Sequence, residues 1–136
     1  MISTESRLHE TKSPVLDKDN IILFGRSLGG AAALSLAAEL NRTERDLKIR
    51  ALILENTFLN VPALMSHLMP LISAMSALVT NSWHSDDRIS ELDPELPVLF
   101  LSGGSDELIP PPMMAALFEK CPCVKKEMAH FPGGTP

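Results

Sequence analysis

A serine between two glycines is the feature of this sequence that most constrains its fold. The stretch Gly25-Arg26-Ser27-Leu28-Gly29 directly follows the apolar run at residues 21–24 and precedes an alanine-rich segment at 30–40. A strand, a tight turn and a helix in this order are the context in which G-x-S-x-G lifts a serine hydroxyl above the end of a sheet. Because both glycines lack a Cβ, we expect strand and helix to approach closely there. The pattern predicts a nucleophilic Ser27, with a structural turn serine as the alternative.

Apolar runs alternate with helical patterns along the rest of the chain. The predicted strands are residues 21–24, 49–54, 97–101 and 124–131, and the predicted helices are residues 28–41 and 111–120. Unbroken apolar strands separated by helices are typical of a parallel sheet that is covered on both faces. The sequence therefore predicts an α/β fold with a mostly parallel sheet of about four strands and flanking helices.

Charge and cysteine content exclude several classes of protein. The 136 residues include 12 basic and 17 acidic side chains, a formal net charge of −5, and no basic cluster, which argues against a nucleic-acid partner. The two cysteines, in Cys121-Pro122-Cys123, are too close in sequence for a comfortable disulfide and lack a second pair to complete a zinc site. We interpret them as incidental thiols. The first twenty residues are polar and show no signal peptide.

Two acidic residues stand at predicted strand ends, where open α/β sheets bind their ligands. Asp106 follows the third strand in Ser102-Gly103-Gly104-Ser105-Asp106, and Glu55 follows the second. A triad acid holds an imidazole from a fixed loop, and the chain order in such sheets is Ser, acid, His. Asp106 fits that order, with a turn-capping role as its alternative. For Glu55 we predict a structural role at the strand end.

The segment between the second and third strands, about residues 56–90, is predicted to be an insertion. It has no charged side chain from residue 56 to 85, and residues 61–79 are rich in Met, Leu and Ala. This apolar stretch approaches the roughly 20 residues that cross a bilayer, but Pro70 and His67 inside it argue against a membrane span. Two interpretations remain open: helices that cover the sheet, or an apolar wall for an acyl chain formed by Met65, Met69 and Met75.

Together these motifs resemble the α/β-hydrolase superfamily, and more narrowly the eukaryotic α/β-hydrolase-domain proteins related to serine aminopeptidase-like hydrolases and protein depalmitoylases. The similar stretches are residues 23–30, 55–58, 102–111 and 131–135. The resemblance implies that Ser27 is the nucleophile, Asp106 the acid and the backbone N–H of Leu28 an oxyanion donor.

The reaction implied by the resemblance is acyl transfer from an ester, thioester or amide to water. The substrate is then a small molecule or a lipidated protein, and neither a metal nor an organic cofactor is required. A cytoplasmic or membrane-associated location, the latter through a longer parent protein, is a further expectation from the resemblance.

Two departures from the family pattern suggest a partial hydrolase fold. In such proteins the phrase that matches residues 131–135 is followed by the catalytic His, and here that position is Pro136. The family also has several strands before the serine, including the loop that donates a second oxyanion N–H, where this chain has about twenty polar residues. We expect a polar, disordered leader at residues 1–15, followed at 16–136 by the carboxyl-terminal part of a hydrolase domain.

The missing base leaves two hypotheses about function. His130 is a candidate surrogate base, although it lies on a predicted strand six residues before the expected site, roughly 20 Å of extended chain. The first hypothesis is a serine hydrolase whose 136-residue chain is inactive by itself. The second is a non-catalytic remnant, which acts as a binding or regulatory module or is a partial gene product.

Overall fold

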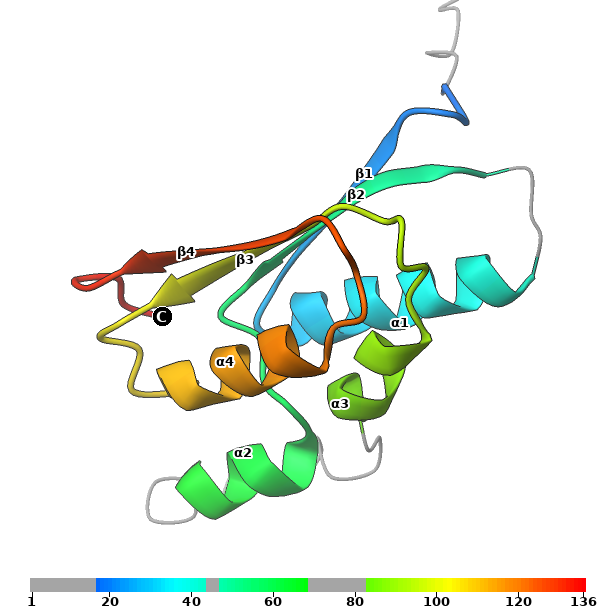
Figure 1. Ribbon diagram of the computed structural model, residues 1–136. Helices are drawn as coiled ribbons and strands as arrows, with labels where there is room; N and C mark the ends of the chain where they lie inside the picture. Colours follow the sequence, from blue (N-terminus) through cyan, green and yellow to red (C-terminus); the bar gives the residue numbers. More distant parts are fainter. Residues whose placement is uncertain (1–16, 44–46, 69–82) are drawn as a thin grey trace, which may run out of the picture.

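The computed structural model describes residues 17–43, 47–68 and 83–136. Four parallel strands form one sheet in the order β1-β2-β3-β4 (Figure 1). The strands are β1 (Ile21–Arg26), β2 (Ile49–Glu55), β3 (Val98–Gly103) and β4 (Lys126–Phe131). The helices are α1 (Leu28–Arg42), α2 (Val61–Leu68), α3 (Ser85–Arg88), which continues into a 3₁₀ turn at Ile89–Glu91, and α4 (Pro111–Lys120). The predicted fold class is confirmed, and no predicted strand or helix end is displaced by more than two residues.

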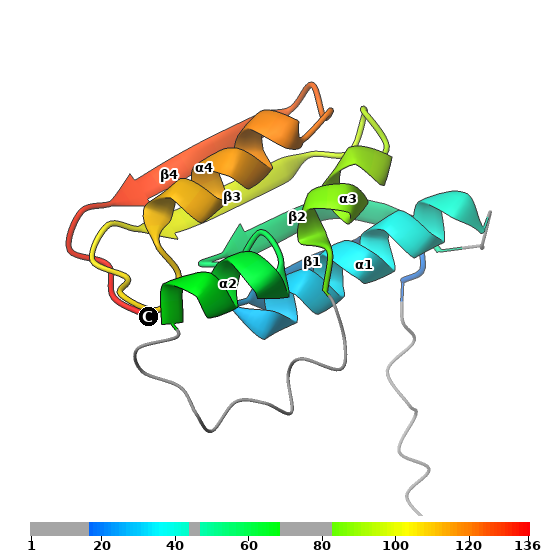
Figure 2. The same ribbon diagram turned by 90° about the horizontal axis from the view of Figure 1, so that it is seen from below.

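The described helices lie on one face of the sheet, as Figures 1 and 2 show, so the prediction of a sheet covered on both faces is wrong for this part of the chain. Each strand pairs with the next one along the chain, so the sheet grows in a single direction. Right-handed crossovers then place every connecting helix on the same side. On the opposite face of β1, the side chains of Ile22 and Phe24 are 61% and 59% exposed.

The main core lies between the sheet and the two long helices. Leu52 and Phe100 point from the central strands toward Leu34 of α1 and Leu117 of α4, and all four side chains are fully buried. Phe100 also meets Phe118 edge to face, with 5.3 Å between ring centroids. Each buried side chain of this size contributes about 1.5–3 kcal/mol relative to an exposed one, so this layer holds β2, β3, α1 and α4 together.

The insertion contributes a second apolar cluster through α2. Asn60 Oδ1 accepts a hydrogen bond of 2.8 Å from the N–H of Ala63 and caps the first turn. The buried face of α2 consists of Val61, Leu64 and Leu68. It packs against Ala31 of α1 and against Ile109 in the loop before α4. None of the described helices has the length and apolar character needed to cross a membrane. The predicted leader at residues 1–15 and the insertion's Met69 and Met75 lie outside the described residues.

Candidate active site

Ser27 occupies the turn between β1 and α1 in an unusual backbone conformation. Its φ is 52° and its ψ is −122°, β1 ends at Arg26 and α1 begins at Leu28. A non-glycine residue in such a region costs of order 1–3 kcal/mol and persists only where the surrounding structure imposes it. The strand, turn and helix predicted around the serine are therefore present.

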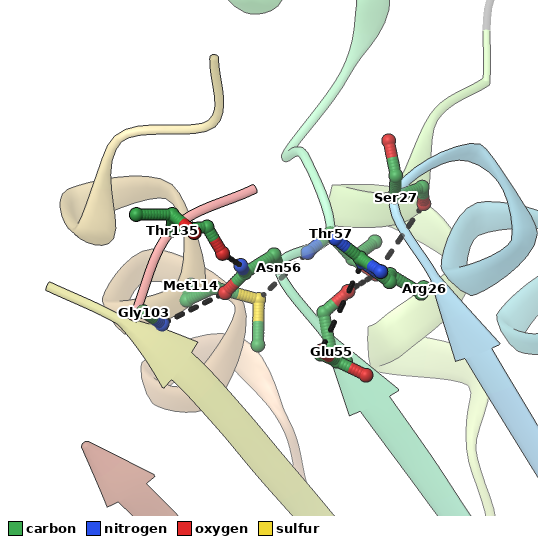
Figure 3. A network of polar contacts seen from close by, with 8 residues as sticks. All are labelled: Arg26, Ser27, Glu55, Asn56, Thr57, Gly103, Met114 and Thr135. Carbon is green, nitrogen blue, oxygen red and sulfur yellow. Dashed lines mark hydrogen bonds and ion pairs between the residues drawn. The ribbon is translucent and has the colours of Figure 1, made fainter. Parts of the chain in front are cut away.

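Hydrogen bonds from the end of β2 fix this turn, as Figure 3 shows. The Ser27 N–H donates to the carbonyl of Glu55 at 3.0 Å, which continues the sheet ladder by one residue. The Ser27 carbonyl accepts from Thr57 Oγ1 at 3.4 Å and from the Gly30 N–H at 3.0 Å. Leu28 opens α1, so its N–H is one of the first-turn amides that no helical carbonyl accepts. That amide has no acceptor among the described residues, and amides at helix N-termini are common binding sites for anions.

Two of the three glycines around the turn are required by close packing. A Cβ on Gly25 would lie 2.2 Å from the Gly29 carbonyl oxygen, and a Cβ on Gly30 would lie 1.7 Å from Thr57 Oγ1. A Cβ on Gly29 would meet nothing within 4 Å. The expected close approach of strand and helix is therefore present at Gly25. The second position that has no room for a Cβ is Gly30, whereas the sequence pattern predicted Gly29.

Asp106 lies in the loop after β3 and is buried, with 5% of its surface exposed. Its Oδ1 accepts hydrogen bonds from the N–H groups of Leu108 at 2.9 Å and Ile109 at 2.8 Å, so the carboxylate does cap this turn. Its Oδ2 has no hydrogen bond from the described part of the chain. The capping role and the role of a triad acid are therefore compatible, since they use different oxygens.

One cavity brings the predicted nucleophile and the predicted acid together. It has a volume of about 320 Å³, and Ser27, Asp106 and Pro136 all line it. Its other walls are Arg26, Asn56, Leu108 and Ile109. Three separate loops, after β1, after β3 and after β4, thus meet at the carboxyl edge of the sheet. Pro136 is the position at which the family resemblance implies a histidine.

Histidines elsewhere do not reach this cavity in the described structure. His130 lies on β4, where its Nε2 is 3.0 Å from the place a Cβ on Gly104 would take. His67 on α2 places its Nε2 3.1 Å from the Glu107 carbonyl oxygen, and His84 precedes α3. None of the three lines the cavity.

The end of β2 contains both a predicted residue and one that the sequence analysis missed. The Glu55 carboxylate lies 3.8 Å from Arg26 Nε, an exposed ion pair of small energetic value, while its carbonyl holds Ser27. Asn56 is buried at a φ of 42°, and its side chain bonds Gly103 and Thr135. The available signal was an asparagine directly after a strand, because Asn tolerates positive φ better than most residues.

A possible metal site lies at α3. The ligand atoms of His84, Asp86 and Asp87 are within 4.8 Å of one another. Asp86 Oδ2 already accepts a hydrogen bond of 2.9 Å from Asn60 and lies 3.8 Å from the Lys120 ammonium. We therefore assign no metal to this group.

Comparison with curated proteins shows relatives in yeast and plants. The chain is 42% identical over 120 residues to the protein bem46 of Schizosaccharomyces pombe, an alignment of 88% of this chain and 38% of that protein. It is 35% identical over 133 residues to the alpha/beta hydrolase domain-containing protein WAV2 of Arabidopsis thaliana, with 88% of this chain and 41% of that protein covered. The chain thus spans about two fifths of the length of these relatives. No family model matches it.

Solved structures agree on the fold. An esterase domain of a Rhodothermus marinus protein superposes with a TM-score of 0.61 at 21% identity, over 84% of this chain and 50% of that one. A monoacylglycerol lipase of Paleococcus ferrophilus superposes with a TM-score of 0.56 at 19% identity, over 86% of this chain and 60% of that one. The relatives and the fold together place the chain: it belongs to the eukaryotic α/β-hydrolase-domain proteins, of which it represents a part.

Proposed function

We propose that this chain is the part of a serine hydrolase that carries the nucleophile, Ser27, and the acid, Asp106. The observation that carries the proposal is the shared cavity at the carboxyl edge of the sheet, lined by both residues. The strained turn at Ser27 supports it, because strain of this kind concentrates at functional sites.

The proposed reaction is acyl transfer to water. Ser27 Oγ attacks the carbonyl carbon of an ester, thioester or amide while a general base takes the hydroxyl proton. The Leu28 N–H, at the positive end of α1, stabilises the oxyanion, and the base then returns its proton to the leaving group. Water repeats the attack on the acyl-enzyme and releases the acid. Asp106 Oδ2 orients the base and stabilises its protonated form.

An acyl group is the substrate feature that the described insertion fits best. Partly buried Met65, Trp83 and Met113 pack around the apolar cluster of α2, which contains Ile109 of the cavity wall. Flexible thioethers adapt to chains of different shape. We therefore favour an esterase-like or depalmitoylase-like activity, and a relative described as a membrane protein of Saccharomyces cerevisiae, 40% identical, supports membrane association of the longer protein.

We further propose that the 136-residue polypeptide does not turn over esters by itself. General bases contribute about 10²–10⁴-fold in rate, and no described histidine lines the cavity with Ser27. This observation also favours the second candidate function, a non-catalytic module that keeps the fold and binds an acyl group.

The test is labelling by a serine-directed phosphonate of the 136-residue chain and of its Pro136→His variant. Because position 136 lines the cavity, we expect the histidine to raise the labelling rate at least about a hundredfold, the lower end of the range for general bases. Ser27→Ala in either background should abolish labelling. Asp106→Asn keeps the Oδ1 turn cap but loses the charge, so it should reduce labelling of the histidine variant without unfolding it.

Two outcomes would contradict this proposal. Equal Ser27-dependent labelling of the unmodified chain would mean that His130 or another base already completes the site. Absence of Ser27-dependent labelling in the folded Pro136→His variant would favour the non-catalytic module.

A further inference from the structure

Asn56 is the residue common to two neighbouring cavities. It lines the cavity of Ser27 and Asp106 and also a second cavity of about 290 Å³ between the ends of β2, β3 and β4. Residues on the second cavity wall include Glu55, Gly103 and Thr135. The side chain of Asn56 therefore stands between the proposed reaction centre and the segment that leads to position 136.

Both ends of the Asn56 amide group are used. Its Oδ1 accepts a hydrogen bond of 2.8 Å from the N–H of Gly103, the last residue of β3. Its Nδ2 donates to the carbonyl of Thr135 at 3.4 Å (Figure 3). The backbone N–H of Asn56 donates to the carbonyl of Leu101 at 3.0 Å. The Asn56 side chain thus connects its own segment to the end of β3, 47 residues away in sequence, and to the turn after β4, 79 residues away.

The turn after β4 is otherwise held by the loop after β3. The Gly104 N–H donates to Phe131 at 2.7 Å, and Ser105 donates to Gly134 through its N–H and to Pro132 through its hydroxyl, each at 2.9 Å. These bonds stop at Gly134. Among the contacts of the described residues, the Asn56 amide makes the hydrogen bond that reaches Thr135, the residue directly before position 136.

Close packing leaves little freedom for another arrangement. A Cβ on Gly103 would lie 2.7 Å from the Gly134 carbonyl oxygen and 3.1 Å from Asn56 Nδ2. Glycine at 103 therefore lets β3, the turn and the amide meet at one point. The positive φ of Asn56 aims its side chain there at a backbone cost that Asn bears more easily than most residues.

We infer that Asn56 is a positioning residue for the hydrolase site: its side-chain amide fixes the turn after β4, so that chain position 136 stays beside Ser27 and Asp106. The inference rests on the proposed function for the meaning of that site, but the geometry it asserts is independent of activity. Asn56 does not touch the reacting atoms in this assignment; it acts through the segment that it holds.

The test is Asn56→Asp in the 136-residue chain. The substitution keeps the shape, the tolerance of positive φ and the Oδ1 acceptor for Gly103, but replaces the Nδ2 donor by a carboxylate oxygen that repels the Thr135 carbonyl. Backbone relaxation by NMR should show Thr135 rigid in the unmodified chain and with an order parameter below about 0.6 in the variant at neutral pH. The Gly103 amide should stay protected from hydrogen exchange in both.

A pH titration separates positioning from general destabilisation. Protonation of the new carboxyl restores an O–H donor to the Thr135 carbonyl, so acidification should make Thr135 rigid again. Arg26, Glu55 and Asp106 are charged groups that line the same two cavities, and the unmodified chain, taken through the same pH range, is the reference for their effect. Asn41→Asp is the matched control, since it removes an amide donor to the Glu91 carbonyl elsewhere in the molecule.

Rigid Thr135 in the folded variant at neutral pH would overturn the inference. If the variant does not fold, hydrogen exchange of the Asn56 side-chain amide in the unmodified chain is the test. The proton donated to the Thr135 carbonyl should exchange slowly, and exchange at the rate of a free amide would contradict the assignment. Failure of Ser27-dependent labelling in the folded Pro136→His variant, with the Thr135 result intact, would count against the proposed function and leave the positioning role standing.

Discussion

At the scale of single residues, the candidate site depends on a close fit between the serine turn and the residues after β2. Thr57 is fully buried, and its side chain fills the space that a Cβ on Gly30 would need. Its Oγ1 donates to the carbonyls of Ser27 and Glu55. Its N–H lies 3.1 Å from Met114 Sδ on α4. Thr57, which takes no part in the proposed reaction, therefore supports the backbone of the proposed nucleophile.

A pair of glycine substitutions tests this fit. Gly30→Ala places a methyl group within 1.7 Å of Thr57 Oγ1, and we expect the free energy of unfolding to fall by about 1–3 kcal/mol, the usual cost of overpacking. Gly29→Ala, one residue away in the same helix, meets nothing within 4 Å and should gain about 0.5–1 kcal/mol, because alanine is the better helix former. Urea unfolding of both variants gives the comparison. Equal effects at the two positions would contradict the packing described here.

The sequence revealed the site residues unevenly. Ser27 and Asp106 were predictable because each carries a local signal, a glycine-flanked turn and a loop after an apolar strand. Asn56 and Thr57 were not, because most of their partners lie in distant segments of the chain: Gly103 and Thr135 are 47 and 79 residues from Asn56, and Ser27 is 30 residues from Thr57. Side-chain contacts of that range follow from the assembled sheet and leave no periodic pattern in the chain.

At the scale of elements, the link between α4 and β4 shows how a polar group closes a helix end. Lys126 Nζ donates to the carbonyls of Phe118 and Cys121, both at 2.8 Å, and lies 4.7 Å from the centre of the Phe118 ring. Cys121 and Cys123 are free and buried in the same core, and Cys123 Sγ donates to the Asp93 carbonyl at 3.3 Å. They are thus packing residues, in agreement with the interpretation of two unpaired thiols.

The buried Cys123 predicts a loss of stability in alkaline solution. Burial, then the Cys121 thiol and Asp93, raise the pKa of Cys123 to about 12, while Lys126 opposes this. The unfolded thiol ionises near pH 8.5, so above that pH the unfolded chain binds fewer protons than the folded chain and the free energy of unfolding falls as the pH rises toward 12.

The measurement is urea unfolding between pH 8 and 11 on the unmodified chain and on Cys123→Ala. The chain has no tyrosine, and its lysines and Cys121 are present in both proteins, so Cys123 is the thiol that differs between them. We expect the unmodified chain to lose more stability than the variant. Parallel pH profiles would show that the thiol ionises as easily in the folded state as in the unfolded one.

At the scale of the whole molecule, strand order decides which surfaces are covered. Apolar runs and their spacing were sufficient to predict the four strands, the two long helices α1 and α4, and the parallel sheet. They did not predict that the described helices share one face, because unbroken apolar strands are typical of sheets covered on both sides. That consequence requires the order β1-β2-β3-β4, which sequence periodicity does not contain.

Alternation along β1 gives a direct test of this one-sided arrangement. Ile22 and Phe24 point away from the helices and are largely exposed, whereas Leu23 between them packs against the main core. The double change Ile22→Thr and Phe24→Thr places a β-branched side chain at both strand positions and removes exposed apolar surface, so the free energy of unfolding should change by no more than about 0.5 kcal/mol. Leu23→Thr should cost at least about 1 kcal/mol, since it removes buried apolar surface and introduces a hydroxyl into the core. Both changes in the free energy of unfolding are measured from the midpoints of urea unfolding, provided that the dependence of the free energy on urea concentration (the m-value) stays constant. A loss at Ile22 and Phe24 as large as at Leu23 would mean that another part of the chain covers this face in the folded state.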